Sequence, residues 1–124
     1  MTNLLKETEH VLEHYNKTPS DIDWIGSYDG KYAISWEEFK NLAVSVSYDA
    51  GFGAQKIASD IVIVFKDGDW LSRYEYDGSE AWELHSLPKK SANPKPIYRL
   101  CVTEKEIGWK VIAELNKKAK QHGD

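Results

Sequence analysis

Two histidines four residues apart, His10 and His14, are the first side chains whose spacing could support chemistry. On a helix this spacing places both imidazoles on one face, where they can share a metal ion. The adjacent Glu9 and Glu13 point to other parts of the helix surface, and the sequence places no third ligand nearby. We therefore expect an exposed, solvated pair and no metal site.

A glycine-containing segment and two aspartate pairs match ligand-binding motifs only in part. Residues 51–56 (GFGAQK) contain glycines and a lysine, but they follow a predicted helix and lack the final glycine and the Lys-Ser/Thr pair of a phosphate-binding loop. The aspartate pairs at positions 21/23 and 67/69 lack the twelve-residue calcium pattern with its central glycine and closing glutamate. Loop, turn and cap roles explain these residues better.

Four charged residues of a predicted antiparallel meander could form an acid–base cluster. The predicted register places Arg73 and Glu75 on one face of the sheet and Glu83 and His85 on the other, so cross-strand ion pairs explain them. The single cysteine is Cys101, and the sequence shows no basic residue that would serve as the partner of a nucleophilic thiol. We therefore expect a buried apolar thiol. No serine lies in a nucleophile-elbow pattern. We predict a non-enzymatic protein without a cofactor.

Charge is divided unevenly along the chain, whose formal net charge is −4. Residues 1–87 hold 16 acidic and 7 basic side chains, a net charge of −9, whereas residues 88–124 hold 4 acidic and 9 basic side chains, a net charge of +5. The chain is also rich in aromatic residues, with five Trp and seven Tyr. Trp and Tyr serve both cores and recognition surfaces. An acidic surface of this kind can steer the protein towards a basic partner.

Two interaction surfaces are therefore candidates. The preferred one is an acidic, aromatic-rich surface that binds a protein partner through Asp67, Asp69, Trp70, Glu75, Asp77, Glu80 and Trp82. The alternative is a basic C-terminal third that binds nucleic acid through Lys89, Lys90, Lys95 and Arg99. The overall acidity of the chain favours the protein partner over direct binding of nucleic acid.

The elements that must position these residues belong to one globular domain over residues 1–124. The longest apolar run, residues 61–65, is far shorter than a bilayer span. The N-terminus lacks the basic start and long apolar stretch of a signal peptide, so we expect a cytoplasmic protein.

Three helices are predicted from hydrophobic periodicity and capping signals. The first runs from Thr2 to about Lys17, and the second follows a capping box at residues 35–38 and ends near Tyr48. A similar box at residues 103–106 opens the third helix, whose expected inward residues are Ile107, Val111, Ile112 and Leu115.

The predicted strands form a hairpin at residues 23–28 and 31–35, a meander at residues 61–65, 70–76 and 81–87, and a further strand at residues 97–102. Two-residue Asp-Gly turns would place Phe65 opposite Trp70 and Tyr74 opposite Ala81. Both sheet faces are substantially apolar, so we expect both to be partly covered. The fold class is α+β, with three helices packed around an antiparallel sheet in the order α-β-β-α-β-β-β-β-α.

Three stretches carry a resemblance to a known group of proteins. They are residues 70–83 (WLSRYEYDGSEAWE), residues 30–39 (GKYAISWEEF) and residues 48–53 (YDAGFG). Together they resemble small uncharacterised proteins of tailed bacteriophages and prophages over about residues 24–88. Ala81 stands where that pattern has another aromatic residue.

The resemblance implies a phage or mobile-element accessory protein in a bacterial cytoplasm. Small acidic proteins in that setting are often inhibitors of host defence, including anti-CRISPR and anti-restriction proteins. The resemblance therefore suggests an inhibitor that occupies the basic nucleic-acid groove of a defence nuclease. A phage accessory protein that binds nucleic acid through the basic C-terminal third is the alternative.

Overall fold

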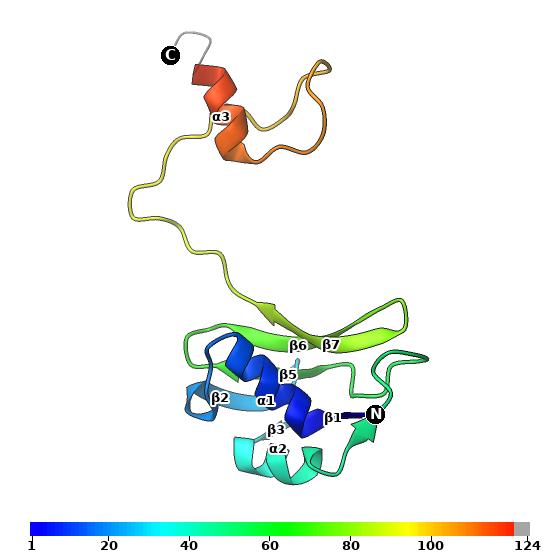
Figure 1. Ribbon diagram of the computed structural model, residues 1–124. Helices are drawn as coiled ribbons and strands as arrows, with labels where there is room; N and C mark the ends of the chain where they lie inside the picture. Colours follow the sequence, from blue (N-terminus) through cyan, green and yellow to red (C-terminus); the bar gives the residue numbers. More distant parts are fainter. Residues whose placement is uncertain (121–124) are drawn as a thin grey trace. The chain divides into compact units, whose positions relative to one another are not determined.

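The computed structural model describes residues 1–120, with side chains described up to residue 117. Contacts divide the chain into two compact units, residues 1–88 and the part that begins at Lys89 (Figure 1), and each unit is described by itself. The boundary coincides with the change in the sign of the charge along the sequence. The single globular domain expected over residues 1–124 stays a prediction.

A five-stranded antiparallel sheet forms the centre of the first unit. Its strand order is β3-β2-β5-β6-β7. The bounds are β2 (Ile22–Ser27), β3 (Ala33–Ile34), β5 (Ile61–Phe65), β6 (Trp70–Tyr76) and β7 (Ser79–His85). A separate two-stranded sheet pairs β1 (Thr2–Asn3) with β4 (Ser47–Tyr48).

Two α-helices of the first unit begin at residues that cap them. Asn3 accepts a hydrogen bond from the backbone N–H of Lys6 at the start of α1 (Leu4–His14). The predicted capping box is confirmed at the start of α2 (Trp36–Ala43), where the Ser35 hydroxyl and the Glu38 side chain each bond the other residue's backbone N–H. This helix ends at Ala43 rather than near Tyr48, and a short 3-10 turn, η1 (Pro19–Asp21), follows α1.

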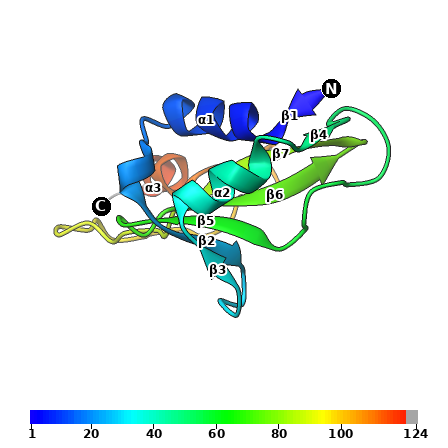
Figure 2. The ribbon, with the colours of Figure 1, turned by 90° about the horizontal axis from the view of Figure 1, so that it is seen from below.

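Both helices lie on the same side of the five-stranded sheet (Figures 1 and 2). Burial of apolar side chains between helices and sheet drives this arrangement. The buried hydrophobic core includes Leu4, Leu12, Ile25, Phe39, Ala43, Ile63, Phe65, Leu71 and Trp82. Within this unit no helix lies on the other sheet face, so the expected cover by helices is confirmed for one face only.

The predicted meander is confirmed, but its first turn differs from the prediction. The Asp77-Gly78 turn has two residues with positive φ, +50° and +85°, and pairs Tyr76 with Ser79, as expected for a type I′ turn. The turn before Trp70 is longer: the backbone N–H of Phe65 bonds the carbonyl of Asp69, and Val64 faces Trp70.

That difference of one residue changes which side chains share a face. Ile63 now lies opposite Leu71, and both are fully buried beneath the helices. Trp70 lies opposite Val64 on the open face, instead of sharing a face with Ile63 and Phe65 as predicted. Side chains alternate along a strand, so a slip of one residue exchanges the two faces.

The second unit contains α3 (Ile112–Lys120) and irregular chain. The strand predicted at residues 97–102 is absent, because no partner strand meets it within residues 89–120 and the backbone N–H of Tyr98 bonds the side chain of Asn116 instead, at 2.9 Å. The helix predicted from Thr103 starts only at Ile112. Thr103 and Glu106 do form one turn, but Gly108 ends it with a φ of +82°.

The α+β class with antiparallel sheets and three α-helices in residues 1–120 is confirmed. The order of elements differs from the prediction, because the short strands β1 and β4 are added and the strand at residues 97–102 is missing. No helix in residues 1–120 combines the length and the apolar character needed to cross a membrane.

Candidate functional site

A buried cluster of charged and aromatic side chains surrounds Arg73. The Arg73 guanidinium bonds Glu80 Oε2 at 3.0 Å, Tyr48 Oη at 2.8 Å and Glu7 Oε2 at 3.2 Å. It also lies 4.8 Å from the centre of the Trp82 ring. The Arg73 side chain has no exposed area. We call these five residues the Arg73 cluster.

The Arg73 cluster joins elements that are distant in the sequence. Glu80 accepts hydrogen bonds from the backbone N–H groups of Lys56 at 2.6 Å and Ile57 at 3.4 Å, which fixes the segment before β5. The Trp82 indole donates to the Thr8 hydroxyl at 2.9 Å and connects β7 to α1. Buried polar groups require such partners, and here the partners hold the unit together.

The surroundings of the cluster shift the pKa values of Glu80 and Tyr48. Burial alone raises the pKa of Glu80, but the backbone N–H of Lys56 and the Arg73 guanidinium outweigh it, and the pKa lies below its ordinary value. Burial and the hydrogen bond to Glu7 raise the pKa of Tyr48 to about 12. Arg73, Glu80 and Trp82 are buried, and their contacts connect β6 and β7 with α1 and with the segment before β5.

The position of this cluster corrects one expectation from the sequence. Glu80 and Trp82 were predicted on an exposed binding surface, but they are only 5% exposed each. The expected cross-strand ion pairing is confirmed for Arg73 of β6, which pairs with Glu80 of β7, and Arg73 forms a further ion pair with Glu7 of α1.

The open face of the sheet carries a second group of aromatic side chains. Strand alternation places Trp24, Trp70 and Tyr74 on the face opposite the helices, together with His85. The Trp70 and His85 rings stack at 5.1 Å. Tyr28, which follows β2, is 72% exposed. We call these five residues the aromatic face.

Two hollows lie side by side on this face. The first, of about 300 Å³, is lined by Trp24, Tyr28, Val62, Val64, Gly68, Trp70 and Leu87. The second, of about 470 Å³, shares Tyr28, Val62 and Trp70 with the first. Its further lining includes Asp60, Ser72 and His85. Aromatic walls with a few polar groups are typical of binding sites.

Ser72 and His85 line the second hollow, and Glu83 lies near His85, but these three side chains do not form a catalytic triad. His85 Nε2 lies 2.7 Å from the Ser72 hydroxyl and 3.9 Å from Glu83 Oε2. A triad needs the carboxylate on the other ring nitrogen, where it orients the imidazole. Ser72 also lies inside the β6 ladder, whose backbone N–H groups pair with neighbouring strands. The arrangement suits binding better than acyl transfer.

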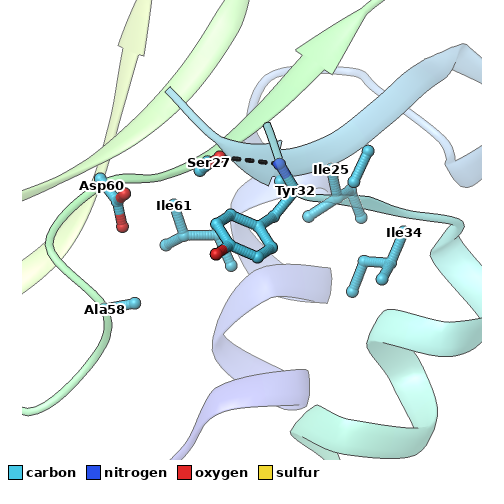
Figure 3. Close-up of a pocket in the computed structure, with 9 residues that line it drawn as sticks. Ile25, Ser27, Tyr32, Ile34, Ala58, Asp60 and Ile61 are labelled. Atoms are coloured by element: carbon cyan, nitrogen blue, oxygen red, sulfur yellow. Dashed lines mark hydrogen bonds between the residues drawn. The ribbon is translucent and has the colours of Figure 1, made fainter. Parts of the chain in front are cut away.

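A third hollow lies at the β2–β3 side of the sheet (Figure 3). Its volume is about 350 Å³, and its walls include Ile25, Tyr32, Ile34 and Ile61. The Ser27 hydroxyl there is already engaged, because it accepts from the backbone N–H of Tyr32 at 3.1 Å. With one aromatic ring among its lining residues, this hollow offers less for recognition than the aromatic face.

The remaining acidic residues predicted to bind a partner lie at two separate places. Asp67 and Asp69 flank Gly68 at the edge of the first hollow, and both form ion pairs with Lys17. Glu75 and Asp77 are exposed at the far end of the β6–β7 hairpin. The structure therefore brings Asp67, Asp69 and Trp70 together and separates them from the hairpin end.

The basic residues predicted as an alternative site lie in the second unit. Lys89, Lys90 and Lys95 are exposed, whereas Arg99 forms an ion pair with Glu106. Cys101 is exposed, which corrects the expectation of a buried thiol. Its segment lies outside any strand and therefore lacks the sheet that was expected to cover it.

The histidine pair on the first helix is placed as expected. His10 and His14 are both exposed on α1. In residues 1–120 no three His, Cys, Asp or Glu side chains come together in a group that could hold a metal ion.

Trp24, Tyr28 and Asp60 were not named as site residues from the sequence. Trp24 directly precedes the buried Ile25, which places it on the opposite face, but an irregularity between Ile22 and Trp24 breaks the simple alternation along β2. Tyr28 and Asp60 lie outside the strands, and only the fold brings them to the same hollow.

No protein-family model matches this chain, no curated protein is significantly similar to it, and no solved structure matches its fold. The resemblance to phage and prophage proteins therefore stays a prediction.

Proposed function

We propose that this protein is a non-enzymatic binding module that recognises a protein partner through the aromatic face. One observation carries the proposal: two adjoining hollows, walled by aromatic side chains, lie on a sheet face that no helix of the first unit covers. Exposed, partly apolar surfaces of this kind mark interaction sites. Aromatic side chains in such pockets supply much of the binding energy of protein interfaces.

The charge of the first unit supports a basic partner. Its residues 1–88 carry the net charge of −9. Carboxylates near the aromatic face add to this field, among them Asp60, which lines the second hollow, and Glu83, whose side chain is half exposed. Such a field accelerates association with a basic surface and weakens as salt is added.

The finer proposal for the partner is a bacterial defence nuclease whose basic nucleic-acid groove is occupied by this acidic unit. Its supports are the charge of the first unit and the resemblance to phage and prophage proteins. Binding in that groove would compete with nucleic acid. An inhibitor of this kind requires no catalytic residue of its own.

The test is a quantitative capture experiment from bacterial lysate with three forms of the protein. The unchanged protein is compared with the double variant Tyr28→Ala/Trp70→Ala and with the control Tyr32→Ala. Tyr32 is also an exposed tyrosine, but it lines the third hollow. We expect a partner that the control retains and the double variant loses, with capture decreasing as salt is raised. Urea unfolding of each variant checks that the fold persists.

A second candidate function, nucleic-acid binding by the second unit, rests on its exposed lysines. Reversal of Lys89, Lys90 and Lys95 to glutamate tests it in the same assay. Capture that survives this reversal and treatment of the lysate with nuclease supports the protein-binding proposal. Capture lost in both cases, and unchanged in the double variant, contradicts it and favours nucleic acid.

A further inference from the structure

We propose that the paired hollows of the aromatic face receive an arginine side chain of the partner, held between aromatic rings and the carboxylate of Asp60. This inference rests on the proposed function and specifies the chemistry of the group that anchors the partner.

The walls of the paired hollows are largely aromatic. Trp24, Tyr28 and Trp70 line the first hollow, and Tyr28 and Trp70 continue into the second. The faces of aromatic rings attract cations, and Trp does so most strongly. The apolar floor, Val62 and Val64, suits the methylene stem of a long cationic side chain.

Asp60 is an exposed carboxylate at the same hollows. Asp60 lines the second hollow, and within residues 1–120 its side chain has no hydrogen bond or ion pair. Figure 3 shows Asp60 at the rim of the third hollow beside Ala58 and Ile61. Because Asp60 lines both the second and the third hollow, it lies where these two hollows approach each other. Two cations of the first unit, Lys17 and Arg73, form ion pairs with other carboxylates.

The combination favours arginine over other groups. A guanidinium is flat, stacks on aromatic faces and can bond a carboxylate through two N–H groups at once. A lysine ammonium is a more strongly hydrated point charge and stacks less well. A nucleotide base could also stack here, but its phosphates would meet Asp60, Glu83 and an acidic unit.

The test uses the full chain and three blocked tripeptides, acetyl-Gly-X-Gly-amide, in which X is arginine, lysine or citrulline. Citrulline keeps the shape of arginine but carries no charge. Binding is followed by NMR through the indole N–H signals. Those of Trp24 and Trp70 report on the hollows, and that of Trp109, in the second unit, is the internal reference.

We expect a saturable shift of the Trp24 and Trp70 signals with the arginine peptide and binding about tenfold weaker with the citrulline peptide. Asp60→Asn should weaken binding of the arginine peptide and leave the weak citrulline binding unchanged. The exposed control variant Asp23→Asn, on the same unit, should bind the arginine peptide as the unchanged protein does.

Equal binding of the arginine and citrulline peptides, no binding of either, or tighter binding of the lysine peptide would overturn the inference. So would a shift produced by a single-stranded oligothymidine and not by the arginine peptide. The capture experiment separates this failure from failure of the proposed function. If Tyr28→Ala/Trp70→Ala still loses the partner, the aromatic face binds a protein through another group; if it does not, both proposals fail.

Discussion

Removal of the Glu80 side chain provides a sharp test of how the first unit is held together. In Glu80→Ala the Arg73 guanidinium loses its 3.0 Å partner, and the backbone N–H groups of Lys56 and Ile57 lose their acceptor. Glu7 and Tyr48 remain as partners of Arg73. We expect partial compensation and local opening rather than complete unfolding.

The magnitude follows from burial. The Glu80 side chain is 2% exposed and that of Arg73 is 0% exposed, so solvent screens the pair little. Removing one member of a buried ion pair typically costs about 3–5 kcal/mol. With a denaturant slope of about 1–3 kcal/mol per molar urea, the unfolding midpoint should fall by about 2 M.

The assay is urea unfolding followed by tryptophan fluorescence, with Glu83→Ala as the matched control on the same strand. The Glu83 side chain is 51% exposed and lies 3.9 Å from His85, so its removal should change stability by less than about 0.5 kcal/mol. Hydrogen exchange should accelerate at the amides of Lys56 and Ile57 in Glu80→Ala but not in the control.

The pH dependence has a definite sign. Because the folded-state pKa of Glu80 lies below the ordinary 4.5, its stabilising contribution is present above that value and is lost as the pH falls through the folded-state pKa. The difference in stability between the unchanged protein and Glu80→Ala should therefore shrink in acid. Equal midpoints for the two proteins at neutral pH would refute the reasoning, because the buried pair would then contribute nothing.

Three further predictions concern single residues. Gly78→Val should destabilise by about 1–3 kcal/mol in thermal unfolding, because a β-branched residue is strained at a φ of +85°, and an unchanged midpoint would show that the turn does not hold the hairpin. Tyr48, whose pKa is raised to about 12, should be the last tyrosine to ionise in a titration at 295 nm. Its contribution to stability is fully present below pH 10 and is lost as the pH rises through about 12. A titration of Tyr48→Phe that keeps the late step would contradict this. The exposed thiol of Cys101 should react with Ellman's reagent in the folded protein as fast as in urea, and a protected thiol would contradict the irregular segment around it.

The sequence alone determined the elements whose causes are local. The Ser35–Glu38 capping box starts α2, because a side chain must satisfy the first free N–H groups of a helix. Asp77-Gly78 makes the two-residue turn, because both positions need positive φ. The apolar stripe of α1 likewise follows from helical spacing.

The tertiary structure decided the features that depend on distant partners. Asp69 rather than Trp70 lies opposite Phe65, and this difference of one residue places Trp70 on the open face. The strand expected at residues 97–102 has no partner strand in the described part of the chain, and a strand cannot exist without one.

The site itself divides in the same way. The aromatic excess and the division of charge were visible in the sequence, and they indicated recognition by an acidic surface. Burial divides the residues that were predicted to bind a partner. Glu80 and Trp82 are buried and contact the Arg73 guanidinium, because a buried charge requires partners within the protein. Trp24 and Asp60 lie beside the same pair of hollows as Trp70 because β2 pairs with β5 and β5 pairs with β6. Only the packing of the whole sheet brings together residues that are so far apart in the sequence.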